Sequence, residues 1–75
     1  MEDKDEMQAR LAYWIRYYRR KSSLSQLELA LSVGVDTRQI GRIEQKNNVP
    51  SAIFAYQLAK ALQVSMDDLF RPISK

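Results

Sequence analysis

The stretch TRQIGRIE, residues 37–44, carries two arginines one helical turn apart. In a helix, Ile40 and Ile43 would share one face, and Arg38 and Arg42 would lie on the opposite one. Arginine presents a planar fork of donors that matches N7 and O6 of guanine in the DNA major groove. The spacing is therefore typical of a helix that reads base pairs. An ordinary solvated face is the alternative interpretation of the same residues.

Three further residues around this stretch fit contact with DNA. Thr37 opens it, and a threonine can bond to a base or touch a thymine methyl. Gly41 lies in its middle, where glycine costs about 1 kcal/mol relative to alanine. Close approach to a groove or to a neighbouring helix would explain Gly41, and both explanations stay open. Gln26 opens the preceding helix, where unpaired amides and the helix dipole favour a phosphate, although a solvated surface glutamine is the alternative.

Short helices must hold these side chains, and their starts are marked in the chain. One pattern occurs three times: an apolar residue, a capping side chain, a polar residue three positions on, and a second apolar residue. The three copies are Leu24-Ser25…Glu28-Leu29, Val35-Asp36…Gln39-Ile40 and Val64-Ser65…Asp68-Leu69. In each, the polar residue can reach back to the cap. Three helix starts are therefore predicted.

The remaining helices follow from apolar spacing. Residues 6–20 lack Gly and Pro and read as one amphipathic helix, and another begins near Pro50. A helix over about 26–32 would end at Gly34, which can adopt the left-handed conformation, and the next helix begins two residues later. Helices joined by so short a turn must cross steeply, as in a helix-turn-helix. The sequence predicts an all-α fold of five helices without strands.

Composition limits the kind of function. The chain has 75 residues, enough for one small domain, and contains neither Cys nor His. Without the commonest metal ligand and general base we expect no enzyme, no metal and no cofactor. No apolar run approaches the roughly 18 residues of a membrane span, so a cytoplasmic protein is expected. From residue 8 onward eleven Lys or Arg stand against five Asp or Glu, an excess that suits a phosphate-bearing partner.

Together these residues resemble the lambda-repressor and Cro type of helix-turn-helix, also called the xenobiotic-response-element family. The matching pieces are Ile15-Arg16…Tyr18-Arg19, Leu24-Ser25-Gln26…Leu29-Ala30, Val33-Gly34-Val35, Ile40…Ile43-Glu44, Pro50-Ser51, Leu58-Ala59-Lys60-Ala61-Leu62 and Val64-Ser65…Asp68-Leu69-Phe70. The resemblance implies a compact five-helix lambda-repressor-like DNA-binding domain over residues 11–70. An acidic segment at 1–10 would partly extend the first helix, and a short tail would follow at 71–75.

The resemblance also implies roles for single residues. By position, the base contacts would be Thr37, Arg38, Gln39 and Arg42, and the DNA-backbone contacts Gln26, Lys46, Asn47 and Asn48. An ion pair between Arg19 and Glu44 would lock the first and third helices together. The chain departs from the family where Gln45-Lys46-Asn47-Asn48 and Gln63 replace turn glycines. Asparagine can adopt the left-handed conformation, so the turn after Glu44 is expected to form without glycine.

One recognition helix reads only a few base pairs, so we expect a two-fold homodimer on half-sites about 10 base pairs apart. The favoured dimer interface is C-terminal and consists of Met66, Leu69, Phe70 and Ile73. A second aromatic cluster consists of Tyr13, Trp14 and Tyr17. It is either an extra core layer under the N-terminal segment, or a surface for a protein partner or a second copy.

The sequence thus predicts a transcriptional regulator, a repressor or autoregulator, that binds double-stranded DNA at a palindromic operator as a homodimer. One alternative is the antitoxin half of a toxin–antitoxin pair. Only residues 71–75 follow the last predicted helix, which argues against the toxin-binding extension that an antitoxin needs. The other alternative is a protein-interaction module on the same fold, and the presence of Arg38, Arg42 and Gln26 argues against it.

Overall fold

The computed structural model describes residues 4–73, and in this range the chain forms five helices and no strand. The helices are α1 (Lys4–Lys21), α2 (Gln26–Val33), α3 (Thr37–Glu44), α4 (Ala52–Leu62) and α5 (Met66–Leu69). The predicted all-α fold with five helices is confirmed, and α1 begins two residues earlier than expected. Glu2 and Asp3 of the acidic segment, and the last two residues of the tail, lie outside the described residues.

Capping side chains start two of the helices as the pattern predicted. Ser25 accepts from the Glu28 amide at 3.0 Å, and the Glu28 carboxylate accepts from the Ser25 amide at 2.8 Å. The same reciprocal box joins Ser65 and Asp68. Both boxes satisfy amides that the first turn of a helix leaves unpaired.

The third predicted capping box, at the start of α3, is wrong. Asp36 accepts from the Arg38 amide at 2.9 Å, and its other oxygen accepts from the Arg38 guanidinium at 3.1 Å. The Asp36 side chain is thus engaged by the residue two positions on, and Gln39 remains exposed at the surface. A cap that bonds to the second helical amide is an established alternative to one that bonds to the third.

Left-handed residues close four of the helices, and after α1 this residue is Ser23 at φ 59°. Gly34 ends α2 at φ 81° and Gln63 ends α4 at φ 60°. After α3 the left-handed residue is Lys46 at φ 64°, so the turn forms there without glycine. The Lys46 amide donates to the Ile43 carbonyl, and the next amide donates to the Arg42 carbonyl at 2.8 Å. This hydrogen-bond pair requires the left-handed conformation directly after the helix cap, whichever residue stands there.

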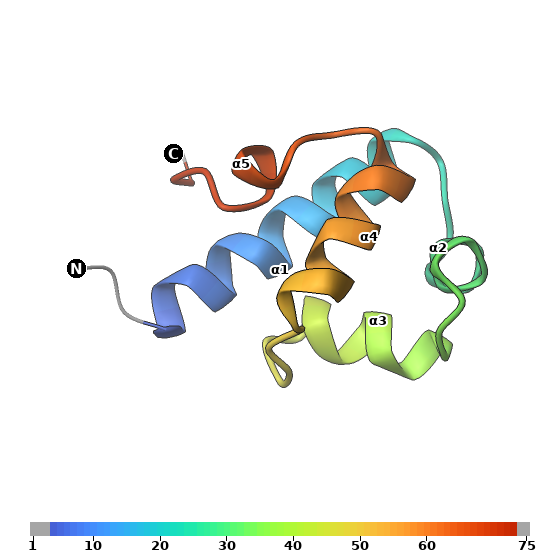
Figure 1. Cartoon of the computed structure of the whole chain (residues 1–75), viewed down its shortest axis with the longest axis horizontal. Coiled ribbons are helices and arrows are strands. Elements are labelled where there is room, and N and C mark those ends of the chain that lie inside the picture. Colours follow the sequence, from blue (N-terminus) through green and yellow to red (C-terminus); the bar gives the residue numbers. More distant parts are fainter. Residues whose placement is uncertain (1–3, 74–75) are drawn as a thin grey trace.

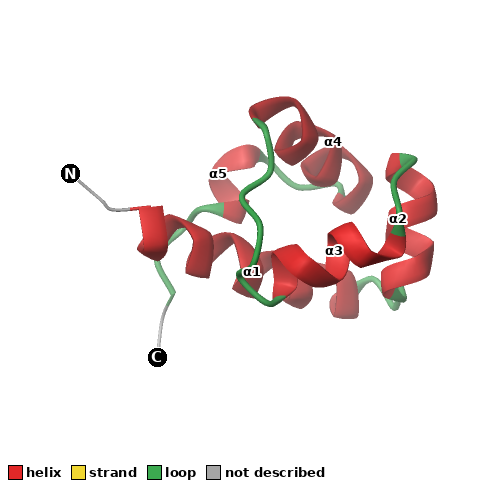
Figure 2. Cartoon of the chain, turned by 90° about the horizontal axis from the view of Figure 1, so that it is seen from below, coloured by secondary structure: helices red, strands yellow, loops and turns green. Residues whose placement is uncertain are grey.

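The helices pack around a single core, with α4 and α5 on the near side of α1 in Figure 1. Figure 2 shows α3 along the underside of the molecule, with α2 crossing it steeply. Each helix contributes to the core. The largest fully buried side chains of the core are Ile15, Leu29, Ile40, Ile43, Leu58 and Leu69. None of the helices described is both long and apolar enough to pass through a lipid bilayer.

Candidate nucleic-acid interface

The exposed side of α3 gathers most of the predicted base-contacting residues. An open hollow of about 300 Å³ lies between the start of α2 and the length of α3. It is lined by Gln26, Thr37, Arg38, Gly41, Arg42 and Gln45. Opposite this side, Ile40 and Ile43 are buried against the core, which fixes the rotation of α3 about its axis. The helical spacing predicted this division into an apolar and a polar face.

A second hollow, of about 440 Å³, lies on the other flank of the same face and contains Gln39. The turn between α2 and α3 forms one wall, and Arg38 and Arg42 line this hollow as well as the first. The two arginines therefore stand on the ridge between both hollows. Their guanidinium groups are the most prominent cationic donors that α3 presents.

Asp36 holds the first of these arginines. The Arg38 guanidinium donates to Asp36 at 3.1 Å, and the Arg38 side chain is 80% exposed. Hydrogen bonds from the Arg38 side chain and amide, together with the nearby charge of Arg42, lower the pKa of Asp36. The same pairing raises the pKa of Arg38. Because both partners are solvated, this pair is weak and Arg38 can exchange Asp36 for a base edge.

Glu44 ends α3 and is the buried charged residue of the core, with 4% of its surface exposed. Arg19 of α1 donates to both of its carboxylate oxygens, at 2.7 and 3.0 Å. Gln26 of α2 donates to one of them at 3.1 Å. Arg16 donates to the Glu44 backbone carbonyl at 2.9 Å. One carboxylate thus ties α1, α2 and α3 together.

This environment sets the charge state of Glu44. Burial alone would raise the pKa of Glu44, but the hydrogen bonds from Arg19 and Gln26 and the positive charges of Arg19 and Arg16 outweigh burial and lower it. The hydrogen bond to Glu44 raises the pKa of Arg19. The residues described leave no buried side-chain polar atom without a hydrogen-bond partner. The pair is therefore charged and fully satisfied, the condition under which a buried ion pair is tolerated.

The hydrogen bond to Glu44 also orients Gln26. Its amide nitrogen points to Glu44, and its carbonyl oxygen lies toward Gly41, where an added Cβ would be 3.7 Å away. That separation is an ordinary contact, so packing within the chain does not require glycine at position 41.

Sequence reasoning missed the links from Arg16 and Gln26 to Glu44. The only available signal was Arg16, three residues before Arg19 on the same helix.

The predicted backbone contacts after α3 lie at the opposite end of that helix from Thr37. Lys46 and Asn47 are exposed, whereas Asn48 is half-buried. The Lys46 carbonyl accepts from the Gln8 side chain of α1 at 2.9 Å. This bond holds the loop against α1 and leaves the Lys46 ammonium group at the surface.

The two predicted protein surfaces differ from expectation in the structure. Leu69 is fully buried, because α5 turns it into the core, so its assignment to a dimer interface is wrong. Met66 and Phe70 are partly buried against the core, and Ile73 is exposed. Trp14 is half-buried and donates to the Arg71 carbonyl at 2.8 Å, so part of its surface stabilises the monomer.

The sequence of this chain is similar to a known protein family and to several known proteins. A family model described as helix-turn-helix matches residues 15–69. Relatives include uncharacterized HTH-type transcriptional regulators of Methanocaldococcus jannaschii, 36% identical, and Archaeoglobus fulgidus, 38% identical. Both alignments span 56 residues, 75% of this chain, and cover 85% and 80% of the respective relatives.

Solved structures with the same fold include the hypothetical transcription factor NHTF from Neisseria. It is 32% identical with a TM-score of 0.85, over 96% of this chain and 85% of that one. The restriction-modification controller protein C.AhdI from Aeromonas hydrophila is 28% identical with a TM-score of 0.80. That alignment covers 84% of this chain and 96% of the controller protein.

Proposed function

The chain belongs to the helix-turn-helix family of transcriptional regulators, and we propose that it represses transcription by binding a palindromic operator as a homodimer. The observation that carries this proposal is the polar face of α3. Arg38 and Arg42 stand together on it, with Gln26 at the start of α2 beside them. Repression requires only that the protein occupy its operator. An autoregulator is a repressor whose operator lies at its own gene.

The proposed base contacts are Thr37, Arg38, Gln39 and Arg42. These four residues lie in the first two turns of α3, the part of a recognition helix that enters the major groove. Each arginine can form a bidentate pair with guanine, which discriminates against a wrong base by about 1–3 kcal/mol. Arg42 is the better test of the two, because Arg38 must first leave Asp36.

The proposed backbone contacts are Gln26, Lys46, Asn47 and Asn48. Gln26 lies at the N-terminus of α2, where backbone amides and the helix dipole attract a phosphate. Its hydrogen bond to Glu44 fixes the side-chain amide before DNA arrives. Lys46 would add a positive charge at the far end of α3. Such contacts position the protein on the duplex and carry no sequence information by themselves.

A homodimer follows from the small reach of one α3 helix. A specific site must be found among a large excess of competing sequences, and a few base pairs do not provide enough discrimination. Two copies related by a two-fold axis read two half-sites, so the operator is expected to be palindromic. We therefore treat the dimer as part of the function.

Selection of bound duplexes from a random pool would identify the operator. Arg42→Ala is then expected to weaken operator binding about 10- to 100-fold and to relax preference at one base pair, with a smaller effect on random DNA. Gln26→Ala should weaken binding to all sequences more evenly. Lys60→Ala on α4, which removes a positive charge away from both hollows, is the matched control.

Binding of the wild type should also weaken steeply with added salt, because Lys and Arg contacts release counterions from the phosphates. An equal loss on operator and random duplex for Arg42→Ala would assign Arg42 to the DNA backbone. Failure of the wild type to enrich any sequence would reject the proposed function.

A further inference from the structure

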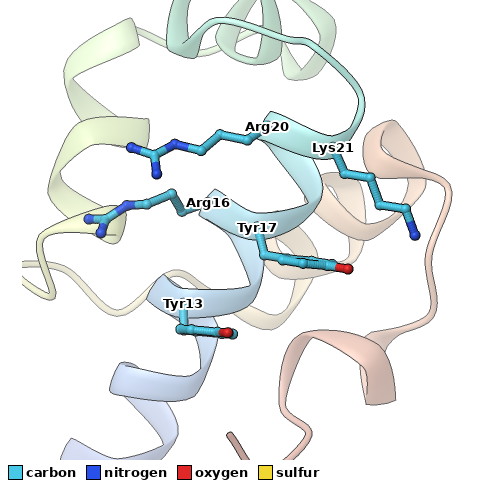
Figure 3. Close-up of a pocket in the computed structure, with 5 residues that line it drawn as sticks. All are labelled: Tyr13, Arg16, Tyr17, Arg20 and Lys21. Carbon is cyan, nitrogen blue, oxygen red and sulfur yellow. The ribbon is translucent and has the colours of Figure 1, made fainter. Parts of the chain in front are cut away.

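The outward side of α1 carries an open groove of about 500 Å³ (Figure 3). It is lined by Tyr13, Arg16, Tyr17, Arg20 and Lys21. Figure 3 shows the two tyrosine rings on one side of the helix and the two arginines extended on the other. Small-molecule sites usually have volumes of about 300–1,000 Å³. The groove therefore has room for a small ligand that lies along α1.

The two tyrosines offer ring faces at the surface. Tyr13 and Tyr17 lie one turn apart on α1, and each is 43% exposed. Trp14 packs edge to face against both, with its ring centroid 4.8 Å from that of Tyr13 and 5.3 Å from that of Tyr17. Trp14 in turn donates to the Arg71 carbonyl, so the three rings form one ordered cluster. Rings held in place in this way lose little conformational entropy when a planar group stacks on them.

The groove is positively charged, because its lining contains three cations and no acid. Arg20 and Lys21 make no ion pair with any residue between 4 and 73. Positive charges in the last turn of a helix also complement the carbonyl end of its dipole. That role explains neither the exposed tyrosines beside them nor Arg16, which lies more than one turn before the end of α1. The charge of the groove favours an anionic ligand.

Tyr13 and Arg16 also line a second hollow, of about 270 Å³, to which Lys46 adds another positive charge. Arg16 is fixed in place by its bond to the Glu44 carbonyl at 2.9 Å, and it retains further N–H donors. Glu44 contributes to this hollow, but its carboxylate is buried and paired with Arg19. The second hollow therefore extends the cationic surface of the groove.

Aromatic faces beside cations select a class of ligand. A guanidinium pairs with phosphate oxygens through charge-assisted hydrogen bonds, and a tyrosine ring stacks on a nucleobase. Arg20 and Lys21 together match the charge of a terminal phosphate, which is about −2 at neutral pH. The bases of duplex DNA are stacked inside the helix, so a duplex offers phosphates to the arginines but no base to the tyrosines. A nucleotide that is not in a duplex offers both.

We propose that this groove binds a nucleoside phosphate, with the phosphate on Arg20 and Lys21 and the base stacked on Tyr17. Arg16 and Tyr13 form the other end of the site. A free nucleotide and an unpaired nucleotide of a single strand share this chemistry. The site lies outside the polar face of α3, whose two hollows are lined by other residues. It is therefore a second binding site, beyond the DNA reading of the proposed function.

Calorimetry with the four ribonucleoside monophosphates tests the site without any DNA. At least one of them should bind about 10-fold or more tightly than its nucleoside and than inorganic phosphate, because base and phosphate then both contribute. The fluorescence of Trp14, the one tryptophan of the chain, should change with the same midpoint, since its ring packs on both tyrosines.

Two variants divide the site into its parts. Arg20→Ala and Tyr17→Leu should each weaken this binding about 10-fold, because one removes a charged donor and the other the stacking face. Tyr17→Phe keeps the ring and should bind like the wild type. Tyr56→Leu on α4 is the matched control, because Tyr56 is an exposed tyrosine with the Lys60 ammonium 5.7 Å from its ring centre, outside the groove. Circular dichroism checks that each variant keeps its helices.

Competition distinguishes the possible sources of the nucleotide. A short single-stranded oligonucleotide that displaces the monophosphate, and that binds less tightly to Tyr17→Leu and Arg20→Ala, would support the site with an unpaired strand as its ligand. A duplex of random sequence that displaces the monophosphate equally well, with no loss in Tyr17→Leu, would overturn the proposal and make the groove a contact for duplex phosphates. Absence of binding by the monophosphates and by the single strand would overturn it as well. Operator binding by Arg42→Ala tests the DNA reading of α3 separately.

Discussion

Glu44→Ala should destabilise the fold more than the replacement by alanine of any other Asp or Glu among the described residues. The substitution removes the acceptor of two hydrogen bonds from Arg19 and one from Gln26. The Arg19 side chain is only 11% exposed, so most of its charge cannot be recovered by water. Its remaining bond to the Leu24 carbonyl, at 2.9 Å, satisfies one donor without neutralising the charge.

The expected loss of unfolding free energy is about 3 kcal/mol. Removing one partner of a buried ion pair costs roughly 3–5 kcal/mol, and the lower end applies because Arg19 keeps its bond to Leu24 and some access to solvent. A domain of this size has about 4–11 kcal/mol of stability in total. Since 1 kcal/mol shifts the melting temperature of such a domain by about 4–8 °C, the melting temperature should fall by at least about 12 °C.

Thermal and urea unfolding followed by circular dichroism would measure this loss. Glu28→Ala is the matched control, because it removes an exposed capping glutamate and should cost about 1 kcal/mol. Replacing Arg19 and Glu44 together by leucine should recover much of the stability, since no buried charge is then stranded. An unchanged melting temperature for Glu44→Ala would refute the buried pair. Equal losses of unfolding free energy for Glu28→Ala and Glu44→Ala would show that burial of Glu44 adds nothing to the strength of its pairing with Arg19.

Three further outcomes are expected. Gly41→Ala should raise the free energy of unfolding by about 1 kcal/mol, since the Cβ of the new alanine meets only an ordinary contact. The same variant should bind the operator more weakly if the groove approaches α3 closely. A destabilised variant would contradict the packing argument. Gln63→Gly should stabilise the protein by about 1 kcal/mol by relieving a left-handed non-glycine residue, and a lower urea midpoint would count against this. Because the pKa of Glu44 is lower in the folded state than its ordinary 4.5, its contribution is complete above pH 4.5 and is lost as the pH falls through the folded value. Urea midpoints measured down to pH 3 should therefore fall less steeply for Glu44→Gln than for the wild type.

Local signals predicted most of the fold. Apolar periodicity and capping residues act within a few positions along the chain, so helix starts at Ser25 and Ser65 could be read directly. The turn at Gly34 and the burial of Ile40 and Ile43 followed in the same way. The capping box predicted at Asp36 failed, because two local caps have similar energy and Asp36 bonds to the second helical amide. The sequence pattern did not decide which residue after Glu44 is left-handed, and Lys46 takes that position.

The candidate interface was predictable only in part. The polar face of α3 follows from its periodicity, whereas the Arg19 to Glu44 pairing was expected from the family resemblance alone. The contacts of Gln26 and Arg16 with Glu44 were not predicted, because they join residues 18 and 28 positions apart. Such contacts depend on how three helices cross, which no local pattern records.

The sequence by itself determined that this protein is an all-α helix-turn-helix with two arginines on the polar face of α3, because periodicity, caps and turn residues act over short distances. Tertiary packing decided which side chains those helices bury and which they expose. It placed Leu69 in the core, turned Trp14 toward the C-terminal segment and left Tyr13 and Tyr17 at the surface. The physical reason is that burial depends on the rotation of each helix against its neighbours, and that rotation is set by the whole core at once.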